Sequence, residues 1–115
     1  LYNEALEGIE GIVVPQVEKN RKHAWHIYCV LAEKRDKLFK FLRSRNIGVN
    51  VHYIPIYRHS LYKKKFNFKP QDFPNTEFVF KRILTLPLFP KMANEDVEFV
   101  VQAVKEGLKE VKGIK

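Results

Sequence analysis

The chain has 115 residues, of which 45% are hydrophobic and 13% aromatic. This length fits a single domain, and the composition is sufficient for a packed core, which excludes an intrinsically disordered chain. No apolar run approaches the roughly 20 residues of a membrane-spanning helix, no signal peptide opens the chain, and Cys29 as the single cysteine excludes an internal disulfide. We therefore expect a cytoplasmic protein with no membrane partner.

The net charge is +8, and most of it is concentrated in one stretch between His52 and Lys69. That stretch contains no acidic residue and five basic ones, Arg58, Lys63, Lys64, Lys65 and Lys69. Aromatic residues are interleaved with them: Tyr53, Tyr57, Tyr62, Phe66 and Phe68. Such a surface favours anionic partners, namely nucleic acid, phosphorylated ligands or anionic lipid. The alternative is a solvated loop whose aromatic side chains turn inward.

The first half of the chain predicts two helices and two strands. Residues 1–7 are expected to be helical, and residues 12–14 to form a short strand that Pro15 closes. Residues 24–32 alternate in the manner of a strand. Residues 35–45 predict a helix with an apolar side made of Leu38, Phe39, Phe41 and Leu42.

The second half predicts a third strand, a long connection and two more helices. Residues 49–54 alternate as a strand does, and residues 55–73 show no clear period. Residues 75–84 are expected to be helical, with Asn75 as the cap and Phe78, Val79 and Ile83 facing inward. Residues 85–88 are expected to be extended. Asn94 is expected to cap a helix whose apolar stripe is Val97, Val100, Val101, Val104, Leu108 and Val111.

Three short strands separated by helices, without a tandem βαβ repeat, predict an α+β fold. We expect a two-layer sandwich in which helices pack on a small antiparallel sheet, and a single domain over residues 1–115. The segment Leu1–Leu6 is typical of the end of a helix whose beginning is missing, and the first residue is not Met. The chain is therefore expected to be a piece of a longer protein.

The residues offer little chemistry for an independent enzyme. One cysteine and four scattered histidines give no metal-ligand spacing, and His52 with His59 is too weak a pair to predict a metal. There is no phosphate-binding glycine loop, no nucleophile motif and no convincing pair of carboxylates. The sequence favours a platform that presents polar and basic groups to an anionic ligand.

Several segments in a fixed order resemble a known family. They are Trp25–Val30, Arg35–Leu42, Asn46–Val49, Val51–Tyr57, Phe73–Glu77, Ile83–Leu88 and the closing amphipathic helix. Together they resemble the C-terminal part of the DegT/DnrJ/StrS family of sugar aminotransferases. The run Asn50–Tyr57 is most similar to the PseC branch, whose enzymes aminate a UDP-linked 4-keto-6-deoxy hexose on the way to pseudaminic acid.

The resemblance implies the small C-terminal domain of a fold-type I enzyme that uses pyridoxal phosphate, with glutamate as amino donor and a nucleotide sugar as acceptor. In the family, the Schiff-base lysine, the acid partner of the pyridine nitrogen and the phosphate cup precede the matched region. We therefore expect no catalytic, cofactor-binding or metal-binding residue in this chain, and no activity from it alone. Lys63, after Ser60, superficially resembles a serine-lysine motif but lies in a charged, wet stretch that does not favour an imine. A homodimer is expected for the intact enzyme.

The same resemblance implies that Asn50–Tyr57 approaches the substrate cleft, often that of a neighbouring subunit. His52 and Tyr53 are the main candidates for substrate binding, followed by Asn50, Tyr57, Arg58 and His59. Arg and His can pair with a diphosphate, and Tyr and Asn can bond to sugar hydroxyls. The alternative for His52 is a residue that only fixes the end of a strand, and the alternative for Tyr53 is a core position.

Two other classes of function remain open. A small nucleic-acid-binding module would use the basic, aromatic stretch as a stacking and phosphate surface, but its aromatics are not expected across a sheet. A pure interaction domain would expose an apolar face for a partner. The reading frame separates these possibilities, because an upstream large domain with a lysine segment identifies the aminotransferase. We expect no sequence-specific nucleic-acid partner.

Overall fold

The computed structural model describes residues 1–111, so the last four residues of the predicted domain lie outside it. Its helices and strands are, in chain order, α1 (Tyr2–Leu6), β1 (Ile12–Val13), β2 (Tyr28–Ala32), α2 (Arg35–Ser44), the 3-10 turn η1 (Ile56–Arg58), α3 (Ser60–Phe66), the 3-10 turn η2 (Pro70–Asp72), α4 (Pro74–Phe80), β3 (Ile83–Leu86) and α5 (Asn94–Val111). The sheet is antiparallel with the order β1-β2-β3. The predicted α+β class with a small antiparallel sheet is confirmed. Within residues 1–111, no helix is both long enough and apolar enough to cross a membrane.

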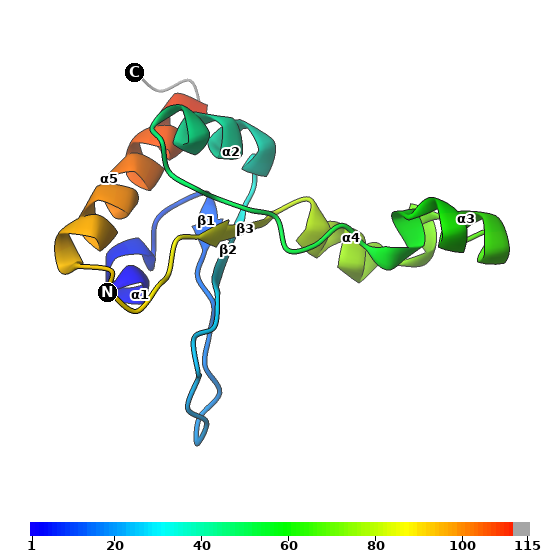
Figure 1. The fold of residues 1–115 in the computed structure, drawn as a ribbon, viewed down its shortest axis with the longest axis horizontal. Coiled ribbons are helices and arrows are strands. Elements are labelled where there is room, and N and C mark those ends of the chain that lie inside the picture. The colour runs from blue at the N-terminus through cyan, green and yellow to red at the C-terminus, as the bar shows by residue number, and fades with distance from the viewer. Residues whose placement is uncertain (112–115) are drawn as a thin grey trace.

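The core lies where α2 and α5 pack together beside the sheet (Figure 1). On β2, alternate side chains face this core, and they are Tyr28, Val30 and Ala32. From α5, the predicted stripe is buried from Val97 to Leu108, and from α2 the buried apolar side chains are Leu38 and Leu42. The apolar side chains that repeat every second residue in β2 and every three to four residues in α2 and α5 therefore pack into one core.

Gly107 lets α5 approach α2 closely. A methyl group placed on Gly107 would lie 2.6 Å from Cδ1 of Leu38 and 2.7 Å from Cδ1 of Phe41. Leu38 is completely buried, so it has little room to move. The glycine is therefore required by packing at this helix crossing.

Two segments project from this body, the excursion between β1 and β2 and the arm formed by residues 55–80 (Figure 1). The arm corrects the prediction of an irregular connection over residues 55–73, because η1, α3 and η2 occupy much of it. No residue of α3 is buried. An apolar stripe forms only where a helix has a core to face, so α3 leaves no such signal in the sequence.

Three other predictions need correction. Residues 49–54 do not form a strand, and the bridge between Asn50 and Thr85 is the pairing that the structure gives there. The predicted strand 24–32 begins only at Tyr28, because Trp25 has a left-handed backbone with φ of 50°. The predicted helix 75–84 is shifted and shortened: Pro74 begins it, it ends at Phe80, and Ile83 already pairs with β2.

Side chains of α4 and the start of α5 also differ from the prediction. Phe78 and Val79 of α4 are 53% and 40% exposed, because α4 lies on the arm and not over the core. The backbone N–H of Ala93 donates to the Asp96 carboxylate at 3.0 Å, so α5 starts with this contact and Asn94 is already its first helical residue. Acidic residues do occupy the first turn of α5, as predicted.

Candidate functional site

Thr85 on β3 joins two segments that are far apart in the sequence. Across the sheet it faces Cys29 of β2. On its other side, the Thr85 N–H donates to the Asn50 carbonyl at 2.7 Å, and the Asn50 N–H donates to the Thr85 carbonyl at 3.2 Å. This pair of backbone hydrogen bonds fixes the start of the segment that carries the predicted site residues.

His52 follows Asn50 and bends back to the same threonine. Its Nδ1 lies 2.9 Å from the Thr85 hydroxyl oxygen, which also lies 3.2 Å from the Cys29 sulfur. Thr85 is buried and His52 is half-buried. The imidazole Nε2 has no hydrogen-bond partner within residues 1–111. His52 is therefore held at the strand end through one nitrogen, and its other nitrogen makes no hydrogen bond within the described residues.

His52 and Tyr53 line an open groove of about 350 Å³. The other lining residues come from the end of this segment, from α4 and from β3, and they are Pro55, Asn75, Thr76, Val79, Phe80 and Ile83. Tyr53 is 77% exposed, which excludes the core alternative for this residue. The groove combines an apolar wall with the polar groups of four side chains, as small-molecule sites do.

Two other hollows, of about 440 and 410 Å³, lie between α1 and α5. None of the predicted site residues lines either of them. Their lining includes charged side chains of both signs, such as Glu98 and Lys105. It lacks the combination of imidazole, phenol and amide groups that lines the groove. The groove is therefore the candidate site.

Tyr57 and Arg58 lie next to the groove, but their polar groups form hydrogen bonds to another residue of the chain, Glu77. The Tyr57 hydroxyl donates to Glu77 Oε1 at 2.6 Å, and Arg58 donates from Nε to Oε1 at 3.0 Å and from Nη2 to Oε2 at 2.6 Å. Hydrogen bonds from Arg58 and then from Tyr57 lower the pKa of the Glu77 carboxyl, while burial raises the pKa of Tyr57. We call Tyr57, Arg58 and Glu77 the arm latch.

The arm latch connects the arm to the body through Phe80. The guanidinium carbon of Arg58 lies 5.1 Å from the centre of the Phe80 ring, and that of Arg35 lies 5.5 Å from it. Arg35 in turn donates to the Ile83 carbonyl at 2.9 Å. Since Phe80 also lines the groove, the latch holds one wall of the site in place.

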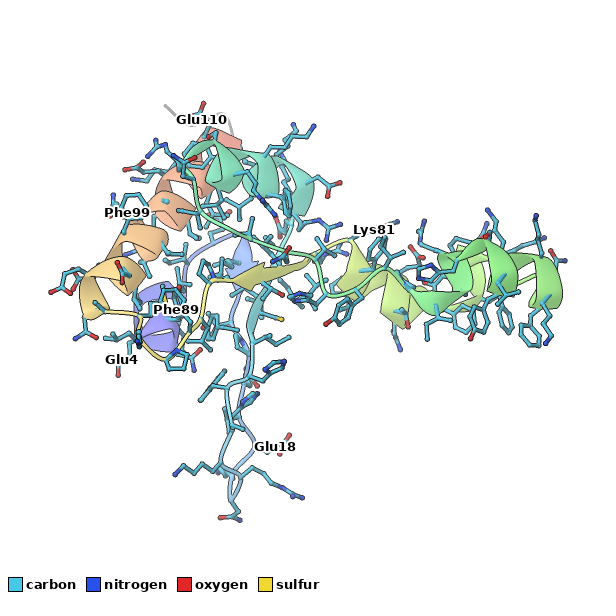
Figure 2. All side chains as sticks on the ribbon, in the orientation of Figure 1. Glu4, Glu18, Lys81, Phe89, Phe99 and Glu110 are labelled. Atoms are coloured by element: carbon cyan, nitrogen blue, oxygen red, sulfur yellow. The ribbon has the colours of Figure 1, made fainter. Side chains whose placement is uncertain are left out.

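The remaining candidates lie outside the groove. The exposed Asn50 contributes its backbone to the bridge with Thr85, and the exposed His59 precedes α3. Along the arm, aromatic rings contact one another in series: Tyr57–Phe73 at 4.4 Å, Phe73–Phe68 at 5.4 Å, Phe68–Phe66 at 5.4 Å and Phe66–Tyr62 at 6.2 Å. Side chains project from both sides of the arm, which leaves the body beyond Lys81 (Figure 2). The structure thus brings His52 and Tyr53 together in one groove, and substrate contact by all six candidates stays a prediction.

Sequence reasoning missed the residues that complete the site from α4 and β3. The sequence predicts Asn75 and Thr76 only as the start of a helix and Thr85 only as part of an extended piece, and it assigns no separate role to Glu77. One signal was available for Thr85, because a polar residue between two buried leucines of a strand needs a buried partner. Glu77 gave no signal, since its partners lie about twenty residues away on the arm.

Comparison with known proteins gives the context of this site. The uncharacterised protein MJ1066 of Methanocaldococcus jannaschii is 44% identical over 92% of this chain and 29% of its own length. The dTDP-3-amino-3,6-dideoxy-alpha-D-galactopyranose transaminase of Aneurinibacillus thermoaerophilus is 32% identical over 86% of this chain and 27% of its own length. The chain thus spans less than a third of the length of these relatives.

The fold is also similar to that of known sugar aminotransferases. The crystal structure of DesV from S. venezuelae superposes with a TM-score of 0.87 at 28% identity, over 94% of this chain and 29% of that one. Residues 1–105 match the family described as DegT/DnrJ/EryC1/StrS aminotransferases. A match over nearly all of the sequence, with the fold to accompany it, shows that this chain belongs to the DegT/DnrJ/EryC1/StrS aminotransferase family.

Proposed function

We propose that this chain is the C-terminal small domain of a pyridoxal-phosphate-dependent aminotransferase that acts on a nucleotide sugar, and that the groove at His52 and Tyr53 contacts that sugar nucleotide. The acceptor is proposed to be a UDP-linked 4-keto-6-deoxy sugar and the donor glutamate, on the ground that the run Asn50–Tyr57 resembles the PseC branch. Family membership and a sugar transaminase among the relatives support the general activity.

The observation that supports the proposal most directly is that Nε2 of His52 has no hydrogen-bond partner within residues 1–111. One ring nitrogen is held by Thr85 and the other is left for a ligand in a groove that also offers the hydroxyl groups of Tyr53 and Thr76 and the amide of Asn75. Imidazole and hydroxyl donors suit the oxygens of a diphosphate and of a sugar ring. The apolar wall of Val79, Phe80 and Ile83 suits the faces of a sugar or a base.

The residues of this chain do not themselves fit pyridoxal phosphate. The cofactor, which carries the amino group between donor and acceptor in this family, needs a lysine for the imine, an acid partner and a cup of donors for its phosphate. Within residues 1–111 every lysine is exposed except Lys105, which is half-buried on α5. A lysine becomes a good nucleophile when it is desolvated or near another cation in a closed pocket. We propose that the cofactor is held by a large domain that this chain accompanies.

We also propose that the complete enzyme is a homodimer in which the segment Asn50–Tyr57 approaches a neighbouring subunit. The supporting observation is a set of exposed apolar side chains on this segment, where Tyr53, Ile54 and Ile56 are 77%, 55% and 63% exposed. Exposed apolar surface of this kind is typical of contact regions. Light scattering of the complete protein gives its mass directly, and a monomer contradicts this part of the proposal.

The test of the proposed function is a transamination assay with the complete protein that contains this domain. The protein is incubated with glutamate and either a UDP-linked or a dTDP-linked 4-keto-6-deoxy sugar, and the amino sugar is measured by mass spectrometry. We expect amination of the UDP-linked acceptor. Amination of the dTDP-linked acceptor alone contradicts the PseC-like specificity, and no amination of any nucleotide-linked keto sugar contradicts the function itself.

A further inference from the structure

Three polar side chains lie in a row across the sheet edge: Cys29, Thr85 and His52. The Thr85 hydroxyl oxygen is 3.2 Å from the Cys29 sulfur and 2.9 Å from Nδ1 of His52. The two backbone bonds of Thr85 run toward Asn50, so Thr85 and Cys29 face each other as a non-hydrogen-bonded pair, the arrangement in which opposite side chains approach most closely. The position of the Thr85 oxygen is therefore set by the backbone.

A threonine hydroxyl has one proton and two lone pairs, and two arrangements of the row use that proton in a hydrogen bond. A third, in which the thiol and Nδ1–H both donate to the Thr85 oxygen, leaves the buried hydroxyl proton without an acceptor among the described residues, which is costly. In the first, the thiol donates to the Thr85 oxygen and the hydroxyl donates to Nδ1 of His52. In the second, Nδ1–H donates to the Thr85 oxygen and the hydroxyl donates to the sulfur. The second directs the hydroxyl proton at a sulfur, which is a weak acceptor, whereas the first directs it at the imidazole lone pair.

We infer that Thr85 is a positioning residue for His52: its hydroxyl donates to Nδ1, so that the neutral imidazole carries its proton on Nε2 and presents an N–H donor to the groove. This inference rests on the proposed function only for the identity of the ligand. The bond made by one ring nitrogen fixes what the other can do. A neutral Nε2–H donor suits phosphate and sugar hydroxyl oxygens, which accept hydrogen bonds.

Thr85 is suited to this role because it is itself held firmly. It is 6% exposed, its backbone is bonded to Asn50, and its neighbours Leu84 and Leu86 are buried in the core. His52, by contrast, is half-buried and lies beyond the end of the sheet pairing. The orientation of the imidazole therefore depends on a side chain from the core, and the specificity of the groove depends on the direction of one hydroxyl proton.

The inference is tested by nitrogen NMR of the His52 ring in the 115-residue chain at alkaline pH, where imidazoles are neutral. The comparison uses the natural chain, Thr85→Val and the rescue variant Thr85→Ser. In the natural chain and in Thr85→Ser we expect Nε2–H, with Nδ1 at the chemical shift of a hydrogen-bonded acceptor. In Thr85→Val, Nδ1 should move to the shift of an unbonded nitrogen, and the tautomer ratio should fall by about fivefold, the effect of losing one neutral hydrogen bond.

Three outcomes overturn the inference: Nδ1–H in the natural chain, a Nδ1 shift that is the same in Thr85→Val, or no rescue by Thr85→Ser. If Thr85→Val fails to fold, Cys29→Ala replaces it as the second variant, because it removes the thiol and leaves the bond from Thr85 to His52. We then expect the His52 signals of the natural chain, and a switch to Nδ1–H contradicts the proposed direction.

A titration with UDP separates this inference from the proposed function. If the ring signals behave as expected but UDP moves neither the Nε2–H signal nor the amides of Asn75 and Thr76, the positioning by Thr85 stands and the proposed ligand is wrong. If UDP shifts those signals but the natural chain carries Nδ1–H, the groove binds the nucleotide and the role given to Thr85 is wrong.

Discussion

The guanidinium of Arg58 donates two hydrogen bonds to the carboxylate of Glu77, from Nε to Oε1 at 3.0 Å and from Nη2 to Oε2 at 2.6 Å. Glu77 is buried although it lies on the arm, and the buried Tyr57 donates to the same carboxylate. Bidentate pairs of this kind fix geometry as well as charge. The arm latch therefore determines how α4 is held against the groove.

Replacing Glu77 by glutamine should release the arm without unfolding the body. The amide keeps the size of the side chain but loses the charge that Arg58 and Tyr57 bond to. We expect the amides of α4 to exchange with solvent faster in Glu77→Gln, while those of α5 keep their protection. Hydrogen exchange measured residue by residue checks this. Glu98→Gln, the same change at an exposed position of α5, is the control and should leave both helices unchanged.

The same latch predicts a dependence of arm stability on acid. The pKa of Glu77 in the folded chain lies below its ordinary value of 4.5, first because of the hydrogen bond from Arg58 and next because of that from Tyr57. A lowered folded-state pKa contributes stability that is present above the ordinary value and is lost as the pH falls through the folded-state value. We expect the protection of α4 to decrease progressively below pH 4.5 and Glu77→Gln to abolish that dependence. An equal acid response in both chains contradicts the assignment to Glu77.

Much of the body could be predicted from the sequence, because its signals are local. The stripe on α5 repeats at helical spacing, and Tyr28, Val30 and Ala32 alternate as a half-buried strand requires. The strand at residues 49–54 was overpredicted for the same reason. Its alternation is real, but an alternating segment forms a strand only where a partner has free backbone groups, and here only Asn50 pairs with Thr85.

The site could be predicted only in part, because its contacts are long-range. His52 and Tyr53 were identified from their segment, but the hydroxyl that orients His52 lies 33 positions further along the chain. The burial of Glu77 likewise depends on Tyr57 and Arg58, which reach it only after α3 and η2 have folded back. Contacts of this kind depend on the register of β2 and β3 and on the path of the arm, which no local pattern encodes.

Replacing Gly107 by alanine should destabilise the chain. Alanine favours a helix over glycine by about 1 kcal/mol, but overpacking a tight core costs typically 1–3 kcal/mol. Since the added methyl would lie 2.6 Å from the fully buried Leu38, we expect a net loss of about 1 kcal/mol in the free energy of unfolding. Urea denaturation measures it. Gln102→Ala, an exposed substitution on the same helix, should change stability by less than about 0.5 kcal/mol.

The chain alone should not bind pyridoxal phosphate at one stoichiometric lysine. Its described lysines are solvent-exposed or half-buried, whereas a Schiff-base lysine needs a desolvated site with an acid partner for the pyridine nitrogen and a cup of donors for the phosphate. After incubation with the cofactor and trapping with borohydride, mass spectrometry of peptides should find scattered, substoichiometric labels. A single lysine labelled to one equivalent contradicts the proposal that the cofactor is held by another domain.

The most direct measurement of the central claim follows the two half-reactions of the complete enzyme separately in His52→Ala. Loss of a hydrogen bond to an ionised group costs about 1.5–3 kcal/mol, which is roughly ten- to a hundredfold in binding. We expect that loss in kcat/KM for the nucleotide sugar, with the glutamate half-reaction almost unchanged, because the donor does not need the groove at His52. His26→Ala, the same change at an exposed histidine outside the groove, should leave both half-reactions as they are. Equal loss in both half-reactions of His52→Ala, or no loss in either, contradicts a role for this groove in binding the sugar nucleotide.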